Sequence, residues 1–248
     1  MSEAPANTSS RGTRILGVLS LVGIAVLLAY AFGISPPDSS AADGGLGESI
    51  RIMYVHVPTV SIAYLALIGN AIFSVFVLWK HSEFADVAAA TCAELGVLLL
   101  GITLVTGSLW GHITWGTYWE WDARLTTTAL LFLMYVGYLA LRSATADPRA
   151  RATRSAIVGI AAAFLIPIVH KSVDWWASLH QQKTLMGTTN TQIGDTQLFT
   201  LLLSMVVVGL ITAWLFMHRF RVGWLANQAE RHGLDQAIAE RRAEGVAA

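Results

Sequence analysis

The chain has 248 residues, a mean hydropathy of +0.56 and 13% charged residues. A soluble domain of this size carries about 25% charged residues, so the composition excludes an ordinary soluble protein and indicates an integral membrane protein. The 16 basic and 16 acidic residues balance to a formal net charge of zero, and no basic patch of the kind that binds nucleic acid is present.

Six apolar segments are long enough to cross a bilayer core, which takes a helix of about 20 residues. They are residues 15–34, 60–79, 87–110, 126–141, 155–173 and 197–217. Backbone groups in lipid must pair within their own segment, so we predict an all-α integral membrane protein, a bundle of six transmembrane helices. We interpret residues 1–248 as a single transmembrane domain that ends in a charged, helical tail over residues 219–248.

The basic residues predict the orientation of the chain. Of the 16 lysines and arginines, twelve fall on the side that holds both termini and four on the other side. The positive-inside rule therefore places both termini on the cytoplasmic side of the membrane. The first apolar segment follows Arg11 and Arg14, and its core of about 20 residues exceeds the 7–15 of a signal peptide, so we expect it to be retained.

The connection between the third and fourth spans carries an unusual concentration of aromatic residues. Residues 115–122 read Trp-Gly-Thr-Tyr-Trp-Glu-Trp-Asp. Tryptophans also form belts at membrane interfaces, but a belt spreads its rings around the protein. Six of the nine tryptophans instead crowd two neighbouring outer connections: Trp110, Trp115, Trp119, Trp121, Trp175 and Trp176. This crowding favours a platform for a large flat apolar partner. If residues 115–122 form a short helix lying on the membrane, Trp115, Trp119 and Asp122 would share one face of it.

Two histidines flank this platform and are candidate metal ligands. His56 precedes Pro58, which suits the first turn of the second span, and His180 lies in the third outer connection. Neutral imidazole is an axial ligand of haem iron, and a porphyrin offers the broad face against which indoles pack. Zinc is the alternative, although it takes three or four N, S or carboxylate ligands. His170 competes with His180, and we expect His112 to cap a turn.

The haem propionates would need cations on the same face. The only basic choices there are Arg124, Arg51, Lys171 and Lys183. Arg124 is the best placed, two residues after Asp122, although an ion pair between these two residues is an equal alternative.

Two further residues limit the chemistry. The single cysteine, Cys92, can form neither an intramolecular disulfide nor a haem-attachment motif, so a bound haem b would be non-covalent, and the thiol is expected to be a small buried hydrophobe. Glu94 is the one carboxylate within a span, and we expect it to bond to a neighbouring helix.

The string Trp115-Gly116-x-x-Trp119-x-Trp121-Asp122, followed by Ala-Arg-Leu-Thr, resembles the WWD signature of haem-handling membrane proteins in cytochrome c maturation. Six spans and the segments 55–58 and 172–181 narrow the resemblance further. From about residue 14 to residue 221, the chain is similar to the haem exporter protein C (CcmC) family.

This resemblance implies His56 and His180 as axial haem ligands. It also implies a haem-binding motif, composed of Trp115, Gly116, Trp119, Trp121 and Asp122. Haem would be presented at the outer, periplasmic face and passed to a haem chaperone, CcmE. The implied partners are CcmD and the ABC-transporter subunits CcmA and CcmB, besides membrane lipid.

We therefore expect a haem-binding and delivery protein rather than an enzyme. The chain has no Gly-rich nucleotide loop, so any ATP dependence would come from a partner. Two alternatives remain. The protein could catalyse covalent haem attachment to the chaperone by aligning the reactants, or it could be a channel subunit that moves haem across the membrane.

Overall fold

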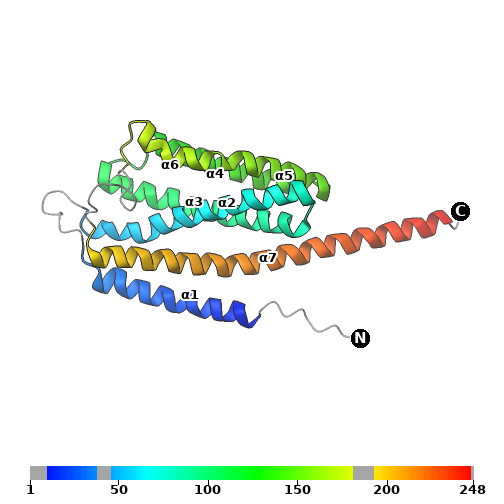
Figure 1. Ribbon diagram of the computed structural model, residues 1–248, viewed down its shortest axis with the longest axis horizontal. Coiled ribbons are helices and arrows are strands. Elements are labelled where there is room, and N and C mark those ends of the chain that lie inside the picture. Colours follow the sequence, from blue (N-terminus) through cyan, green and yellow to red (C-terminus); the bar gives the residue numbers. More distant parts are fainter. Residues whose placement is uncertain (1–9, 38–45, 181–192, 247–248) are drawn as a thin grey trace.

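The computed structural model describes residues 10–37, 46–180 and 193–246, which fold mainly into long helices (Figure 1). In chain order these are α1 (Arg11–Ala29), the π-helical turn η1 (Tyr30–Ile34), the 3-10 turn η3 (Glu48–Ile52), α2 (Met53–Lys80), α3 (Glu83–Trp115), α4 (Ala123–Ala144), α5 (Pro148–Ala163), α6 (Leu165–Trp175) and α7 (Asp195–Val246).

Six helical segments in the described ranges are long and apolar enough to cross a membrane. They are Arg11–Ile34, Glu48–Lys80, Glu83–Trp115, Ala123–Ala144, Pro148–Trp175 and Asp195–Glu230. This confirms the predicted all-α membrane protein with six spans. The helices extend beyond the predicted apolar segments because polar residues cap them: Ser82 accepts a hydrogen bond from the Ala85 N–H at the start of α3.

The predicted start of the second span is wrong. The turn η3 runs directly into α2, which begins at Met53, so Pro58 lies inside the helix rather than in its first turn. Proline has no N–H to donate to the Tyr54 carbonyl. The Thr59 hydroxyl bonds the next two carbonyls, those of Val55 at 2.8 Å and His56 at 3.0 Å. His56 is therefore a residue of the first helical turn and is held by regular structure.

The fifth span consists of two helices rather than one. α5 ends at Ala163 and α6 begins at Leu165, with Phe164 between them. Pro167 cannot donate to the Ala163 carbonyl, and this missing bond explains the break.

The helices form adjacent layers (Figure 1). α1 packs along α7, α7 packs on α2 and α3, and α4, α5 and α6 cover the other side. At one end of the bundle, which we call the tryptophan end, α3 and α6 finish and α2, α4 and α7 begin. The opposite end, where α2 and α4 finish, is called the arginine end. The centre of the bundle is closely packed around Leu67, Leu100, Leu131, Tyr135 and Val169, each at most 1% exposed.

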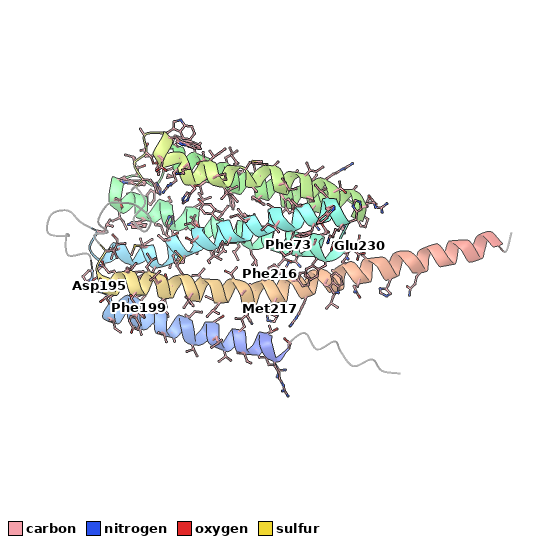
Figure 2. The ribbon with its side chains drawn as sticks, in the orientation of Figure 1. Phe73, Asp195, Phe199, Phe216, Met217 and Glu230 are labelled. Atoms are coloured by element: carbon pink, nitrogen blue, oxygen red, sulfur yellow. The ribbon has the colours of Figure 1, made fainter. Side chains whose placement is uncertain are left out.

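Ion pairs join the helices towards the arginine end. Arg142 of α4 binds both carboxylate oxygens of Asp86 on α3, at 2.6 and 2.9 Å. Glu94 of α3 pairs with Arg219 of α7, which confirms the predicted bond of this carboxylate to a neighbouring helix. α7 then continues without a break to Val246, as Figure 2 shows for the part between Asp195 and Glu230. The predicted tail is thus an extension of the last span.

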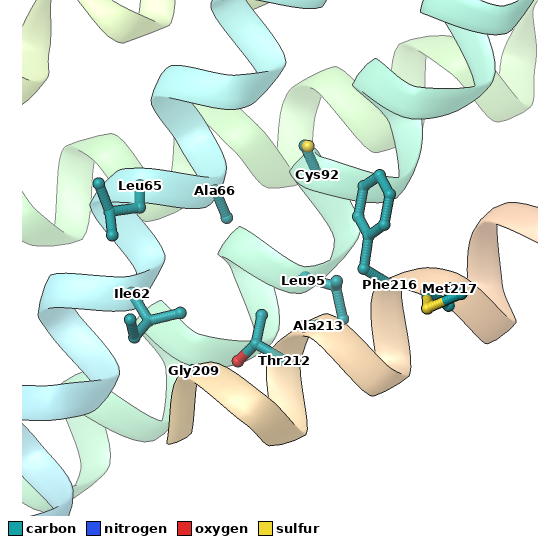
Figure 3. A pocket seen from close by; sticks show the side chains of 10 residues that line it. All are labelled: Ile62, Leu65, Ala66, Cys92, Leu95, Gly209, Thr212, Ala213, Phe216 and Met217. Atoms are coloured by element: carbon teal, nitrogen blue, oxygen red, sulfur yellow. The ribbon is translucent and has the colours of Figure 1, made fainter. Parts of the chain in front are cut away.

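A groove of about 460 Å³ opens between α2, α3 and α7 (Figure 3). Side chains such as Ile62, Leu65 and Phe216 line it, with Thr212 as the one hydroxyl among them. Cys92 also lines it and is buried, in agreement with the prediction of a small buried hydrophobe. The groove contains no histidine and no charged group, so the predicted ligands lie elsewhere.

Candidate functional site

The tryptophan-rich segment is an irregular connection between α3 and α4. α3 ends at Trp115 because Gly116 adopts a left-handed conformation (φ 78°) and donates its N–H to the His112 carbonyl at 3.0 Å. α4 begins after Asp122, whose carboxylate accepts from the Leu125 N–H at 2.7 Å. The predicted short helix with Trp115, Trp119 and Asp122 on one face is therefore wrong, since a helix stop and a helix start lie only six residues apart.

Asp122 connects this segment to the chain that follows α6. Its second oxygen, Oδ2, accepts a hydrogen bond of 2.5 Å from the Ser178 hydroxyl. The Ser178 hydroxyl in turn accepts from the His180 backbone N–H at 3.1 Å. The same Oδ2 lies 3.8 Å from Nδ1 of the His180 ring. One carboxylate therefore caps α4 and fixes the position of a predicted ligand 58 residues away.

His180 is held as a neutral imidazole. Its ring lies edge-on to the Trp115 indole, with 5.2 Å between the ring centroids, and its Nδ1 is buried without a hydrogen-bond partner. Burial, together with the nearby Arg124 cation, lowers the pKa of His180 to about 4 against the opposing effect of Asp122. The neutral ring has the lone pair that a metal ligand needs.

His56 packs against the last turns of α3 from the other side. Its Nδ1 lies 3.1 Å from the Thr106 hydroxyl oxygen, and its ring is edge-on to Trp110 at 5.8 Å between centroids. The Trp110 Nε1 is buried without a hydrogen-bond partner, as is the Nδ1 of His180. Buried polar atoms are normally paired, so one unpaired nitrogen next to His56 and one in His180 itself are unusual features of this end of the bundle.

The same stretch of α3 thus serves both histidines. His56 contacts Thr106 and Trp110, and His180 contacts Trp115 at the end of the helix.

The other four tryptophans of the tryptophan end form two pairs. Trp119 and Trp121 meet edge-on at 5.6 Å, and Trp175 and Trp176 meet edge-on at 5.7 Å. Trp121 is 80% exposed, and its ring contact among the described residues is with Trp119. Of the predicted motif, the structure brings Trp115 and Asp122 to His180, gives Gly116 the role of helix stop, and leaves Trp119 and Trp121 at the surface beside them.

Arg124 is the predicted cation with no carboxylate within ion-pair distance among the described residues. Its guanidinium lies 3.5 Å from the His170 carbonyl, so the alternative of an ion pair with Asp122 is wrong. Arg51 pairs with Glu48 at 2.5 Å, and Lys171 pairs with Asp174 at 3.2 Å. The fourth predicted cation, Lys183, lies outside the described residues.

The other candidates at this end have different surroundings. His112 lies within the last turn of α3 rather than in the expected turn, its ring stacks on Tyr118 at 4.0 Å between centroids, and only its backbone carbonyl accepts the bond from Gly116 at the helix end. His170 is exposed on α6. In the described part of the chain, no group of three or more His, Cys, Asp or Glu side chains could hold a metal ion, so the zinc alternative has no ligand set there.

Sequence reasoning missed Thr106, whose hydroxyl contacts the His56 ring, and Ser178, whose hydroxyl accepts from the His180 backbone N–H. Thr106 was detectable in principle, because Thr103, Gly107 and Gly111 recur at intervals of four next to it and predict a face of small residues on α3. Ser178 had no comparable signal, since its role depends on the folding of a loop onto Asp122.

Comparisons with known proteins identify the family of the chain. The family described as heme exporter protein C (CcmC) matches residues 2–234. The chain is 36% identical to the heme exporter protein C of Bradyrhizobium diazoefficiens over 208 residues, which span 82% of this chain and 78% of that protein. It is 36% identical to the heme exporter protein C of Haemophilus influenzae over 214 residues, 86% of this chain and 84% of that protein.

A more distant organism has a similar protein. A ccmC-like mitochondrial protein of cytochrome c biosynthesis in Marchantia polymorpha is 43% identical over 140 residues, 56% of this chain and 58% of that protein. The match to the family extends over nearly the whole chain and includes both histidines and the tryptophan-rich connection. The chain therefore belongs to the heme exporter protein C family.

Proposed function

We propose that this chain binds haem b non-covalently at the tryptophan end, with His56 and His180 as the two axial ligands. One observation carries the proposal: two imidazoles from distant parts of the sequence lie against the same last turns of α3, each with an indole edge-on beside it. Two histidines are a common ligand set for haem iron, whereas most other metal ions need more ligands than these.

The surroundings of the two imidazoles fit a porphyrin. Trp110 and Trp115 supply apolar ring surface next to the ligands, and the unpaired buried nitrogens lie beside them. Haem also carries two propionates, which need cations. Arg124 is the candidate, because its charge reaches His180 and it has no carboxylate partner among the described residues. Trp119, Trp121 and the backbone at Gly116 would border the haem at the surface.

The second part of the proposal is delivery of the haem. The ligands lie at a helix start and in a loop at one end of the bundle, where a cofactor can be reached by another protein. The relatives are named for haem export and cytochrome c biosynthesis. We infer that haem is presented at the outer face of the bacterial plasma membrane to the haem chaperone CcmE, with CcmD, CcmA and CcmB as partners in an ABC-transporter complex.

Haem titration of the purified protein tests the ligands. The unaltered protein is expected to give the visible spectrum of six-coordinate, two-histidine haem, and His56→Ala and His180→Ala are each expected to lose it. His112→Ala and His170→Ala are matched controls at the same end of the bundle and should retain it. A two-histidine spectrum that survives either ligand substitution would exclude this pair.

Thiol labelling in intact cells tests the orientation. The only native cysteine, Cys92, is buried and gives a low background. Thr114 is exposed at the tryptophan end and Ser143 is exposed at the arginine end. A membrane-impermeant reagent should label Thr114→Cys in intact cells and Ser143→Cys only after permeabilisation. The reverse pattern would place the site in the cytoplasm and overturn the outer-face proposal.

Reconstitution with the chaperone separates delivery from catalysis. A delivery protein should raise the amount of haem that reaches the chaperone at low haem concentration. With excess free haem, the chaperone should be loaded equally well without the delivery protein. A catalyst of covalent attachment would remain necessary at any haem concentration.

A further inference from the structure

The other hydrogen bonds of Thr106 indicate the direction of its bond with His56. Nδ1 of His56 lies 3.1 Å from Oγ1 of Thr106. The single hydroxyl proton of Thr106 is directed to backbone carbonyls, that of Ile102 at 2.8 Å and that of Thr103 at 3.2 Å. Carbonyl oxygens can only accept, so the Thr106 oxygen is left to accept a hydrogen bond from His56.

This direction determines which ring nitrogen carries the proton. A neutral imidazole has one N–H and one lone pair. If Nδ1 donates to Thr106, the lone pair lies on Nε2. A metal-binding histidine is commonly oriented in this way, by a bond from its second nitrogen to a neighbouring acceptor.

Gly107, the next residue of α3, provides space for the same ring. A Cβ atom at Gly107 would lie 2.8 Å from Cε1 and 3.3 Å from Nδ1 of His56. The first distance is shorter than real Cβ atoms show, so any side chain at this position would displace the imidazole. The ring is therefore held by a hydrogen bond at one edge and by close contact with a bare backbone at the next.

We propose that Thr106 and Gly107 are positioning residues that prepare His56 for iron: Thr106 selects the Nδ1–H tautomer, and Gly107 fixes the place of the ring. This inference rests on the proposed role of His56 as a haem ligand. Neither residue touches the haem in this scheme, and both act through the imidazole.

The tautomer can be measured in the haem-free protein. Nitrogen-15 NMR of labelled histidine distinguishes Nδ1–H from Nε2–H, and His56→Ala identifies the signal. The unaltered protein and Thr106→Ser are expected to show Nδ1–H at His56, whereas Thr106→Val should lose this preference. Thr91→Val is the matched control, because Thr91 is a buried threonine of α3 that makes the same bond to a carbonyl one turn back, at 2.8 Å. An Nε2–H signal in the unaltered protein would overturn the inference.

Haem affinity gives the second measurement. Thr106→Val is expected to weaken haem binding about 10-fold, in the range observed when such outer partners of metal ligands are removed, and Thr106→Ser should restore it. Gly107→Ala should lose the two-histidine spectrum and regain it when free imidazole is added. Gly101→Ala is the control, since its Cβ would meet Phe132 at an ordinary 3.7 Å. Alanine is favoured over glycine inside a helix, so neither alanine weakens α3 itself.

These outcomes separate the two proposals. If His56→Ala leaves the haem spectrum unchanged, the proposed function is wrong, whatever the tautomer. If His56→Ala abolishes the spectrum while Thr106→Val and Gly107→Ala bind haem like the unaltered protein, the proposed function stands and the positioning role is excluded.

Discussion

Oδ2 of Asp122 lies 3.8 Å from Nδ1 of His180 while it accepts a 2.5 Å hydrogen bond from Ser178. This places a carboxylate next to the same ring nitrogen that Thr106 contacts in His56. At His56 the protein holds the Nδ1 edge by a hydrogen bond, whereas at His180 the carboxylate faces Nδ1 without bonding to it, because 3.8 Å exceeds a hydrogen bond. In the proposed haem site, Nε2 of each ring would be the nitrogen that binds the iron.

The charge of Asp122 is expected to matter more than its size. Asn is as good a helix cap as Asp, so Asp122→Asn should leave the stability of α4 nearly unchanged. It removes the carboxylate that faces Nδ1 of His180, and haem affinity should fall about 10-fold. Haem titration combined with thermal unfolding tests this. Equal loss of stability and affinity would mean that Asp122 acts only through the fold.

Acid should release haem from His180 only at low pH. The iron takes the neutral ring, and burial lowers the pKa of His180 from 6.5 to about 4. An ordinary imidazole at pH 5.5 would be about 90% protonated, whereas His180 would remain neutral. In the variant His56→Ala, which loses the two-histidine spectrum and leaves His180 as the only predicted ligand, the remaining one-histidine haem spectrum should be constant from pH 7 to about pH 5. Adding Arg124→Gln to this variant removes a nearby cation, so the haem spectrum should be lost at a higher pH. If half of the spectrum is already lost near pH 6.5 while Arg124 is present, burial does not lower the pKa of His180.

The same pKa predicts the pH dependence of folding. In the unfolded chain His180 binds a proton below about pH 6.5, whereas in the folded chain His180 stays unprotonated down to about pH 4. The unfolded state therefore holds more protons in this interval, and the contribution of His180 to stability decreases as the pH falls through it. His180→Ala should reduce the slope of the unfolding temperature against pH between these values.

The number and type of the helices could be predicted from the sequence, but the residues at which the helices begin and end could not. Six apolar segments of span length specify an all-α membrane protein, because lipid leaves the backbone no other way to pair. The helix ends depend on local bonds that hydropathy does not register. Pro58 was predicted to lie in the first turn of the second span. In the structure the turn η3 continues directly into α2, and the helix therefore starts at Met53.

The site was predictable in its chemistry and not in its geometry. Residue types identified His56, His180 and the tryptophan run, because imidazole and indole are suited to haem. Helical periodicity failed for residues 115–122, since Gly116 can adopt a left-handed conformation that stops the helix. The bond from Ser178 to Asp122 joins residues 56 positions apart, a separation for which one sequence carries no signal.

Gly116 is expected to tolerate Asn better than Ala. Its φ of 78° is a left-handed conformation, and a Cβ there would meet nothing within 4 Å. The cost of Gly116→Ala is therefore one of backbone conformation, roughly 1–2 kcal/mol, and Asn, which adopts this conformation more readily, should cost less. Chemical unfolding in detergent measures both variants. Equal costs would mean that the helix stop does not depend on the left-handed backbone.

The Asp86–Arg142 pair should stabilise the arginine end strongly. Both side chains are only 15% exposed, and both guanidinium nitrogens are bonded, so Arg142→Met leaves a buried carboxylate alone at a cost of about 3–5 kcal/mol. The double variant Asp86→Leu with Arg142→Met removes both charges and should recover most of that loss. Arg151→Met is the control: its partner Glu230 is 43% exposed, and such surface pairs contribute only about 0–1 kcal/mol.

The Asp86–Arg142 pair joins α3 to α4 far from the tryptophan end, so haem affinity should stay the same in all three variants while the unfolding temperature changes. A parallel loss of haem affinity would mean that the two ends of α3 are coupled and that the site depends on the packing of the whole helix.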